Sequence, residues 1–226
     1  MKKYTLTISL AIVFTMLFYS SCREKNLDLQ PLTPTEASYF TEETDFNKAV
    51  LGVYAKLTDL YWYNGGSPIH GFWQLPGDDI TSTGTYAFEI FGTLQPSSDE
   101  NRTFYRVVYQ LINRANTTLQ KLSTEEGVIT TANLKNSLRG ETLFLRGYAN
   151  FLLWNYYGTA PLITERIQSP DKIASPSSKD TELLDQAIKD LTEAAGLLPA
   201  SRPSTNRGRV TSNSANGMLG KALVFR

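Results

Sequence analysis

Four aromatic residues and two adjacent aspartates lie in or beside one long irregular stretch of the 226-residue chain, which follows a segment of helical pattern. Exposed aromatic rings can stack on the apolar faces of pyranose sugars, and carboxylates accept hydrogen bonds from sugar hydroxyls. Long loops often carry binding residues of this kind, although aromatic side chains in a loop can also form its private core. The residues that we predict to contact a ligand are Trp62, Tyr63, Trp73, Asp78, Asp79 and Tyr86.

Asp78 and Asp79 are the carboxylate pair that most suggests catalysis. Glycosidases hold their two carboxyl groups about 5 Å or about 6.5–9.5 Å apart across a cleft, whereas adjacent residues usually diverge in direction. The pair is better interpreted as a turn or capping element, or as acceptors for sugar hydroxyls. A glycoside hydrolase therefore lacks a plausible acid and base here, and we predict no catalytic residue and no enzymatic activity.

Other reactive side chains are few. His70 is the only histidine and Cys22 the only cysteine, so no second such residue exists to complete a zinc site or a disulfide. The chain has neither a Gly-x-Ser-x-Gly nucleophile motif nor a glycine-rich phosphate loop with its flanking strand and helix. Basic and acidic residues balance at 22 each, which gives nucleic acid no bulk charge to bind. We predict no metal, no cofactor and no nucleic acid partner.

The N-terminus has the pattern of a bacterial lipoprotein signal. Lys2 and Lys3 precede an uncharged apolar run over residues 5–18, which is shorter than the roughly 20 residues of a membrane-spanning helix. Two serines then precede Cys22, an arrangement that resembles the lipobox in which the cysteine is acylated. Several acyl chains on one cysteine would give a stable anchor. We predict a signal peptide over residues 1–21 and lipidation of Cys22; an ordinary secreted protein cut nearby is the alternative.

Periodic apolar residues predict a mainly α-helical domain with two long irregular connections. The expected helices span 45–62, 102–123, about 131–157, 179–198 and 212–226, and the connections span 63–101 and 158–178. The third helix is apolar on all sides, as expected of an inner helix that neighbours cover on both faces of a helical repeat. Its Arg139, Glu141 and Arg146 are best explained by internal ion pairs with neighbouring helices.

Three local predictions concern caps, strands and charges. Thr44-Asp45 should cap the first helix, and part of 63–101 should pack as short strands. The fourth helix should carry its acidic residues on the outer side. These residues are Glu182, Asp185 and Asp190.

Further local predictions concern the C-terminal third. Arg202, Arg207 and Arg209 should form a solvated basic loop rather than a phosphate site. Close helix contacts are expected at small residues, namely Gly147, Ala149, Gly217, Gly220 and Ala222. The chain stops within an apolar helical pattern without a C-cap, so we expect it to be the N-terminal part of a longer protein.

Five motifs in order are similar to those of the SusD/RagB family. They cover the chain from Cys22 to its last residue, and the most specific is an arginine-bearing aromatic helix that ends in a Gly-x-x-Pro-Leu turn. The segments are "LDLQPLTPTEASYFTEETDFNKAVLGVYAKL" with "LPGDDITS", "FYRVVYQLINRANTTLQKL", "LRGETLFLRGYANFLLWNYYGTAPLIT", "DTELLDQAIKDLTEAAGLLP" and "GRVTSNSANGMLGKALVF".

The resemblance implies a surface lipoprotein of Bacteroidetes, built as a tetratricopeptide-like helical-repeat scaffold with long irregular loops. Such proteins bind nutrients, most often oligosaccharides, as lids over a SusC-like TonB-dependent outer-membrane transporter, and they are not enzymes. Members are about twice as long, which implies that the C-terminal half of the fold is absent here.

We therefore expect a signal peptide at 1–21, a lipidated tether and docking segment at 22–44, and a SusD-like N-terminal helical domain at 45–226. The expected function is nutrient capture at the outer membrane. The alternative is a helical-repeat lipoprotein scaffold that binds peptides or protein partners, and peptide cargo is a variant of the first hypothesis.

Overall fold

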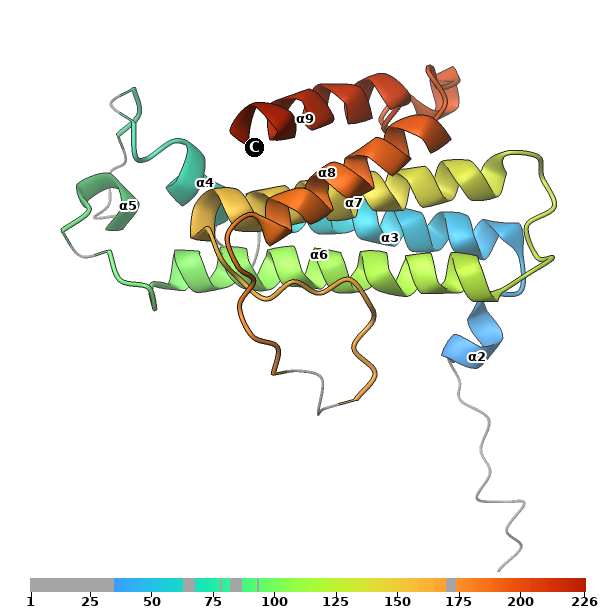
Figure 1. Ribbon diagram of the computed structural model, residues 1–226, viewed down its shortest axis with the longest axis horizontal. Helices are drawn as coiled ribbons and strands as arrows, with labels where there is room; N and C mark the ends of the chain where they lie inside the picture. Colours follow the sequence, from blue (N-terminus) through green and yellow to red (C-terminus); the bar gives the residue numbers. More distant parts are fainter. Residues whose placement is uncertain (1–34, 63–67, 78, 82–86, 93, 170–173) are drawn as a thin grey trace, which may run out of the picture. The chain divides into compact units, whose positions relative to one another are not determined.

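The computed structural model describes residues 35–62, 68–77, 79–81, 87–92, 94–169 and 174–226, and these are mainly helical (Figure 1). The chain divides into two units, Met1–Tyr39 and Phe40–Arg226. Helix α2 (Glu36–Tyr39) belongs to the first unit. The predicted signal peptide and Cys22 lie outside the described residues and stay predictions, as do the domain limits.

Within the described part of the second unit, the five long helices match the five predicted ones to within a few residues at each end. They are α3 (Glu43–Tyr61), α6 (Asp99–Thr124), α7 (Leu134–Tyr157), α8 (Glu182–Leu197) and α9 (Ser212–Phe225). A 3₁₀ turn at Ser204–Asn206 precedes helix α9. Thr211 caps the start of α9, because its side chain accepts a hydrogen bond from the Ser214 amide.

The connection after α3 contains two short helices, α4 (Pro68–Trp73) and α5 (Ala87–Ile90). The predicted short strands are therefore wrong for the described part of this connection. In α4, Ile69 is buried and Phe72 packs on the Phe104 ring with centroids 4.4 Å apart. A spacing of three residues puts both side chains on one helical face, so this apolar pair favours a helical turn.

The start of α3 differs from the predicted cap. Helix α3 begins one residue before Thr44, and Asp45 lies inside its first turn. The Asp45 carboxylate accepts bonds from the backbone amides of Thr41 and Glu42 at 3.3 and 3.2 Å. These amides have no carbonyl partner within the helix, so a carboxylate at this position satisfies them and complements the helix dipole.

Helix α7 is the inner helix of the second unit. It packs against α6 and α3 on one side and against α8 on the other, and α8 packs in turn against α9 (Figure 1). More than half of its residues are buried, which explains why its sequence is apolar on all sides. The prediction of an inner helix covered by its neighbours is therefore confirmed, as is the mainly α helical-repeat class.

Apolar side chains gather on both sides of α7. The larger core joins α3, α4 and α6 to α7 and includes Val53, Phe104, Leu111 and Leu153. Two smaller clusters join α7 to α8 and α9, around Leu143 and Phe151. Helix α7 ends at Tyr157, and Gly158 follows it with a φ of +69°, a backbone conformation that glycine adopts without strain.

Gly147 permits the close approach of α7 to α8. A Cβ atom at this position would lie 3.1 Å from the Asp190 Cβ and 3.2 Å from the Ala187 carbonyl oxygen. The prediction of a close contact at Gly147 is therefore confirmed. At Gly217 and Gly220 of α9 an added Cβ would meet nothing within 4 Å, so the same prediction is wrong for these two residues among the described contacts.

Gly147→Leu is expected to lower the free energy of unfolding by about 1–3 kcal/mol, because the new side chain would overpack the α7–α8 contact. Gly220→Leu is the matched control, since it adds the same side chain to an open helical position and gains helix propensity. Urea unfolding of both variants checks this, and equal stabilities of the two variants would contradict it.

Glu43 joins α3 to the turn before α7. Its Oε1 accepts from the Thr131 amide at 2.6 Å, and its Oε2 accepts from the Thr131 hydroxyl at 2.7 Å. The hydrogen bonds from Thr131, followed by those from Thr130, lower the pKa of the Glu43 carboxyl from 4.5 to about 2. This carboxylate therefore links two segments 87 residues apart in sequence.

Glu43→Gln should remove stability that depends on pH. A lowered pKa in the folded state stabilises the fold above pH 4.5, and this contribution is lost as the pH falls from 4.5 towards 2. Urea unfolding at several pH values should show wild type more stable than Glu43→Gln at pH 6, with the difference shrinking below about pH 4.5. Glu126→Gln, at an exposed position, is the control. A difference that stays constant down to pH 3 would refute this role.

Helix α7 carries two buried charge networks. The prediction of ion pairs with a neighbouring helix is confirmed for Arg146 and Arg139, which pair with α8, whereas Glu141 pairs with the segment before α9. In the first, Arg146 binds Asp190 of α8 through Nε and Nη2, each at 2.7 Å. Arg146 also donates to the Asn116 side chain and to the Thr164 carbonyl, each at 2.9 Å. Asp190 is only 1% exposed, so its predicted place on the outer side of α8 is wrong.

The second network surrounds Glu141, which is fully buried. Its carboxylate binds Arg209 at 2.6 Å and Arg202 at 2.9 Å, and it accepts from the Tyr54 hydroxyl at 2.9 Å. Burial, with Glu141 as the second cause, raises the pKa of Tyr54, so the phenol stays protonated and can donate. The predicted solvated basic loop is therefore wrong for Arg202 and Arg209; Arg207 is exposed.

Candidate functional site

Exposed aromatic side chains lie where α3 and α4 end. Tyr61, Trp62 and Trp73 are 53%, 67% and 44% exposed, although rings of this size are usually covered. The Tyr61 and Trp73 rings meet edge to face, with centroids 6.1 Å apart at 86°. We call these three residues the aromatic platform.

The position of Trp73 follows from the packing of α4. Ile69 and Phe72 face the core. The Phe72 ring packs on the Phe88 ring of α5, with centroids 4.7 Å apart, and also on Phe104. Gly71 lets the two short helices meet, because a Cβ there would lie 2.8 Å from the Phe88 ring. With its neighbours held inward, Trp73 is left at the surface.

Tyr156 of α7 lies beside Trp73. Burial raises the pKa of Tyr156, so its hydroxyl is neutral at physiological pH. The Tyr156 ring also packs on Phe72 with centroids 4.8 Å apart. A ring that packs against a neighbouring ring, as Trp73 does against Tyr61, loses little conformational entropy when a ligand covers its exposed part.

The structure gives different outcomes for the six predicted ligand residues. Trp62 and Trp73 are exposed on the platform, and Asp79 is exposed in the loop after α4. The other three, Tyr63, Asp78 and Tyr86, lie outside the described residues. Ligand contact stays a prediction for all six.

Sequence analysis missed Tyr61 and Tyr156 as parts of the site. The sequence pattern distinguishes neither residue, because Tyr61 continues the apolar spacing of 45–62 and Tyr156 lies in a helix that is apolar on all sides. The sequence nevertheless contains a signal for Tyr61. Tyr61 and Trp62 are adjacent at the end of the predicted helix, where aromatic side chains no longer continue a stripe that faces the core.

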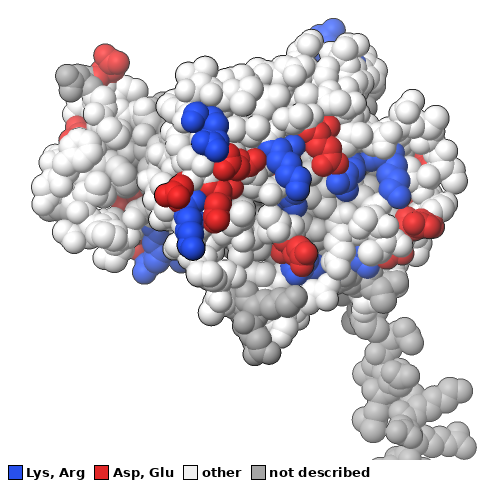
Figure 2. All heavy atoms as spheres, in the orientation of Figure 1, with Lys and Arg blue, Asp and Glu red and all other residues white. Residues whose placement is uncertain are grey.

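On the face that Figure 2 shows, Lys and Arg alternate with Asp and Glu. This face therefore has no patch of a single charge sign that could form an alternative binding site. In the part of the chain that the structure describes, no three His, Cys, Asp or Glu side chains gather as metal ligands. His70 is exposed at the surface of α4. Across the same described segments, no helix is long and apolar enough to cross a membrane.

A comparison with protein families decides the identity. The model of the family SusD-like_3, described as "Starch-binding associating with outer membrane", matches residues 70–223. The chain belongs to this SusD-like family. The match covers α4 to α9 almost entirely, including Trp73.

Solved structures share the SusD-like fold. A SusD superfamily protein from Bacteroides vulgatus is 27% identical, with a TM-score of 0.71 over 83% of this chain and 40% of that one. A "Laminarin binding SusD-like protein" is 26% identical, with a TM-score of 0.72 over 82% of this chain and 40% of that one. A SusD homolog from Bacteroides thetaiotaomicron, 23% identical with a TM-score of 0.69, shows the fold alone and is matched over 84% of this chain and 38% of its own.

These matches confirm the predicted SusD/RagB resemblance and fold class. The chain spans about 40% of the length of the solved SusD-like chains that it matches. A comparison with curated protein sequences found no significant match.

Proposed function

We propose that this SusD-like protein captures glycans at the surface of the outer membrane and that the aromatic platform contributes to their binding. The observation that carries the proposal is an exposed Trp73 that packs edge to face on Tyr61, in a chain of a family described as starch-binding. The relative described as laminarin-binding supports a carbohydrate ligand.

The platform suits a sugar because its rings offer large apolar surfaces beside polar groups. A pyranose presents C–H groups on its ring faces and hydroxyls at its rim, so it needs a flat apolar surface and hydrogen-bond partners at the edge. Asn155 is exposed at the end of α7, next to Tyr156 in the sequence, and it can supply such a partner. Asp79 is a second candidate acceptor, and ligand contact by Tyr63, Asp78 and Tyr86 stays a prediction from the sequence.

The proposal includes a lipid anchor on Cys22 and a SusC-like TonB-dependent transporter as partner. The family's association with the outer membrane supports this location. In this arrangement the protein acts as a lid that traps the ligand above the transporter, and binding without chemistry is sufficient for that role.

Affinity isolation of the full-length protein from native outer membranes tests the proposal. We expect a TonB-dependent transporter to co-purify, and laminarin oligosaccharides to bind the isolated protein. Cys22→Ser is the matched control and should move the protein out of the membrane fraction. Recovery without any such transporter, or tight peptide binding without glycan binding, would overturn the proposal and favour the peptide-binding scaffold.

A further inference from the structure

Phe91, directly after the short helix α5, combines an exposed ring with a disfavoured backbone conformation. Its φ of +53° lies in the left-handed region, where a side chain with a Cβ atom crowds the backbone and glycine is the usual residue. Its ring is 55% exposed, although large apolar side chains are stabilised by burial. Backbone conformations of this kind cluster at ligand sites, so Phe91 is a candidate for ligand contact.

The turn at Phe91 keeps its ring at the surface. Three residues earlier, Phe88 is buried and packs on Phe72 of α4, with ring centroids 4.7 Å apart. If α5 continued through Phe91, a spacing of three residues would place Phe88 and Phe91 on the same helical face. The positive φ ends α5 at Ile90 instead, and the Leu94 amide donates to the Phe91 carbonyl at 3.3 Å. The Phe91 ring therefore remains largely exposed.

Phe91 lies in the same connection as Trp73 of the aromatic platform. Helices α4 and α5 lie side by side at one end of the second unit (Figure 1). Trp73 directly follows Phe72, whose ring contacts Phe88, and Phe91 comes three residues after Phe88. Among the described residues the Trp73 and Phe91 rings do not pack on each other, so each can take its own sugar unit.

Asp79 is held in the segment next to α5. Thr81, two residues after Asp79, donates from its hydroxyl to the Glu89 carboxylate at 2.6 Å. Glu89 belongs to α5 and lies two residues before Phe91. An exposed carboxylate can accept hydrogen bonds from the hydroxyls of a stacked sugar. The Thr81–Glu89 bond therefore brings a predicted ligand residue toward Phe91.

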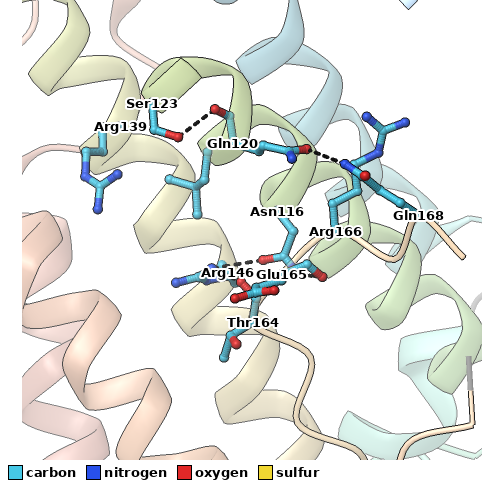
Figure 3. A pocket seen from close by; sticks show the side chains of 10 residues that line it. Asn116, Gln120, Ser123, Arg139, Arg146, Thr164, Glu165, Arg166 and Gln168 are labelled. Atoms are coloured by element: carbon cyan, nitrogen blue, oxygen red, sulfur yellow. Dashed lines mark hydrogen bonds between the residues drawn. The ribbon is translucent and has the colours of Figure 1, made fainter. Parts of the chain in front are cut away.

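A polar hollow of about 400 Å³ between α6, α7 and the segment 164–168 is less suited to a further sugar unit (Figure 3). None of the described residues that line it has an aromatic ring. Arg146 and Asn116 at its base are joined by a 2.9 Å hydrogen bond, and both also bind backbone carbonyls. Arg146 is in addition paired with Asp190. Polar groups that already have partners gain little from a ligand, whereas Phe91 offers uncovered apolar surface.

We infer that Phe91 is a second stacking residue, which receives a further sugar unit of an oligosaccharide bound at Trp73. A pyranose has apolar C–H faces, and a planar aromatic ring can cover one of them. The inference rests on the proposed function, because it takes the aromatic platform as the first contact. Two stacking contacts on one ligand act as linked binding events, so the site takes chains of several sugars in preference to short ones.

Calorimetric titration of the full-length protein with the disaccharide and the hexasaccharide of laminarin tests the inference. Wild type should bind the hexasaccharide more tightly than the disaccharide. Phe91→Ala should raise the hexasaccharide Kd about threefold to tenfold, as expected for one aromatic contact, and leave the disaccharide Kd within about twofold. Phe91→Tyr keeps the ring and should bind both ligands as wild type does.

Two further variants separate the ring from its surroundings. Ile90→Ala removes a neighbouring side chain that is 51% exposed, and it should leave both Kd values unchanged. Phe91→Gly removes the ring together with the backbone strain. It should therefore unfold at a higher urea concentration than Phe91→Ala but bind the hexasaccharide equally weakly.

The results distinguish failure of this inference from failure of the proposed function. An unchanged hexasaccharide Kd in folded Phe91→Ala, equal weakening by Ile90→Ala, or full binding by Phe91→Gly would overturn the stacking role of Phe91, while weaker binding by Trp73→Ala would still support the platform. If Phe91→Ala weakens hexasaccharide binding and Trp73→Ala does not, the platform fails and the role of Phe91 stands. Absence of binding of both oligosaccharides by wild type would overturn both.

Discussion

Asp190→Ala is expected to lower the free energy of unfolding by about 3–5 kcal/mol. The substitution removes the carboxylate that faces Arg146 in a bidentate pair, and the side chains of both residues are nearly inaccessible to water. An unpaired guanidinium would then remain between α7 and α8, and the cost of burying that charge exceeds the lost attraction itself. Urea unfolding followed by circular dichroism measures the change.

Asp185→Ala is the matched control on the same helix. Asp185 pairs with Arg226 at 2.6 Å, but both side chains are almost half exposed. Exposed ion pairs contribute about 0–1 kcal/mol, so this variant should unfold close to wild type. Equal losses in the two variants would show that the burial of the Arg146–Asp190 pair does not determine its contribution.

Glu141→Gln is the second substitution with a large expected effect. The neutral amide would leave Arg202 and Arg209 facing each other in a buried region without a compensating charge. We expect a loss of about 3–5 kcal/mol in the free energy of unfolding. Tyr54 would keep a hydrogen-bond acceptor, so the change isolates the charge.

The consequence of Glu141→Gln should also be local. Arg202 and Arg209 connect the segment before α9 to α7, and Arg202 donates to the Val210 carbonyl at 3.1 Å. Hydrogen exchange of the amides over 202–210 should become faster in the variant. Glu193→Gln is the control, because the Arg139–Glu193 pair is more than one-third exposed. This variant should change the free energy of unfolding by no more than about 1 kcal/mol and should leave hydrogen exchange over 202–210 unchanged. Unchanged exchange over 202–210 in Glu141→Gln would contradict this role.

Local periodicity was sufficient to predict the helices, because apolar spacing reports which side of a helix is covered. The inner position of α7 was predictable for the same reason, since an all-round apolar helix needs neighbours on both sides. Gly158 ends α7 as expected, and its positive φ gives the physical reason. These signals are contained within a few turns of chain.

The errors concern residues whose partners are distant in sequence. Asp190 has the spacing of a solvent-exposed acid, and only Arg146, 44 residues earlier, explains its burial. Arg209 resembles a loop cation, but its carboxylate partner is 68 residues away. A periodic pattern shows which face of a helix is polar. It does not show whether a residue far away in the sequence will bury that face and pair with its charges.

The candidate site was predictable in part. Trp62 and Trp73 were identified from their residue type in a long connection, and both are exposed. The ring that packs on Trp73 belongs to Tyr61 at the end of α3, and Tyr156 of α7 lies nearby. No local pattern brings these helix ends together, because their meeting depends on how α4 packs through Phe72.

The affinity of laminarin oligosaccharides for the full-length protein and for Trp73→Ala tests the central claim most directly. Truncation of an aromatic residue that anchors a ligand typically costs at least about 2 kcal/mol, so the Kd should rise roughly 30-fold. Phe225→Ala is the control, because Phe225 is 50% exposed on α9 and its ring packs on Phe151 and Trp154 rather than on the three platform residues. The Kd of this variant should stay within about twofold of wild type. Absence of binding by wild type, or an unchanged Kd in a folded Trp73→Ala protein, would contradict glycan capture at the aromatic platform.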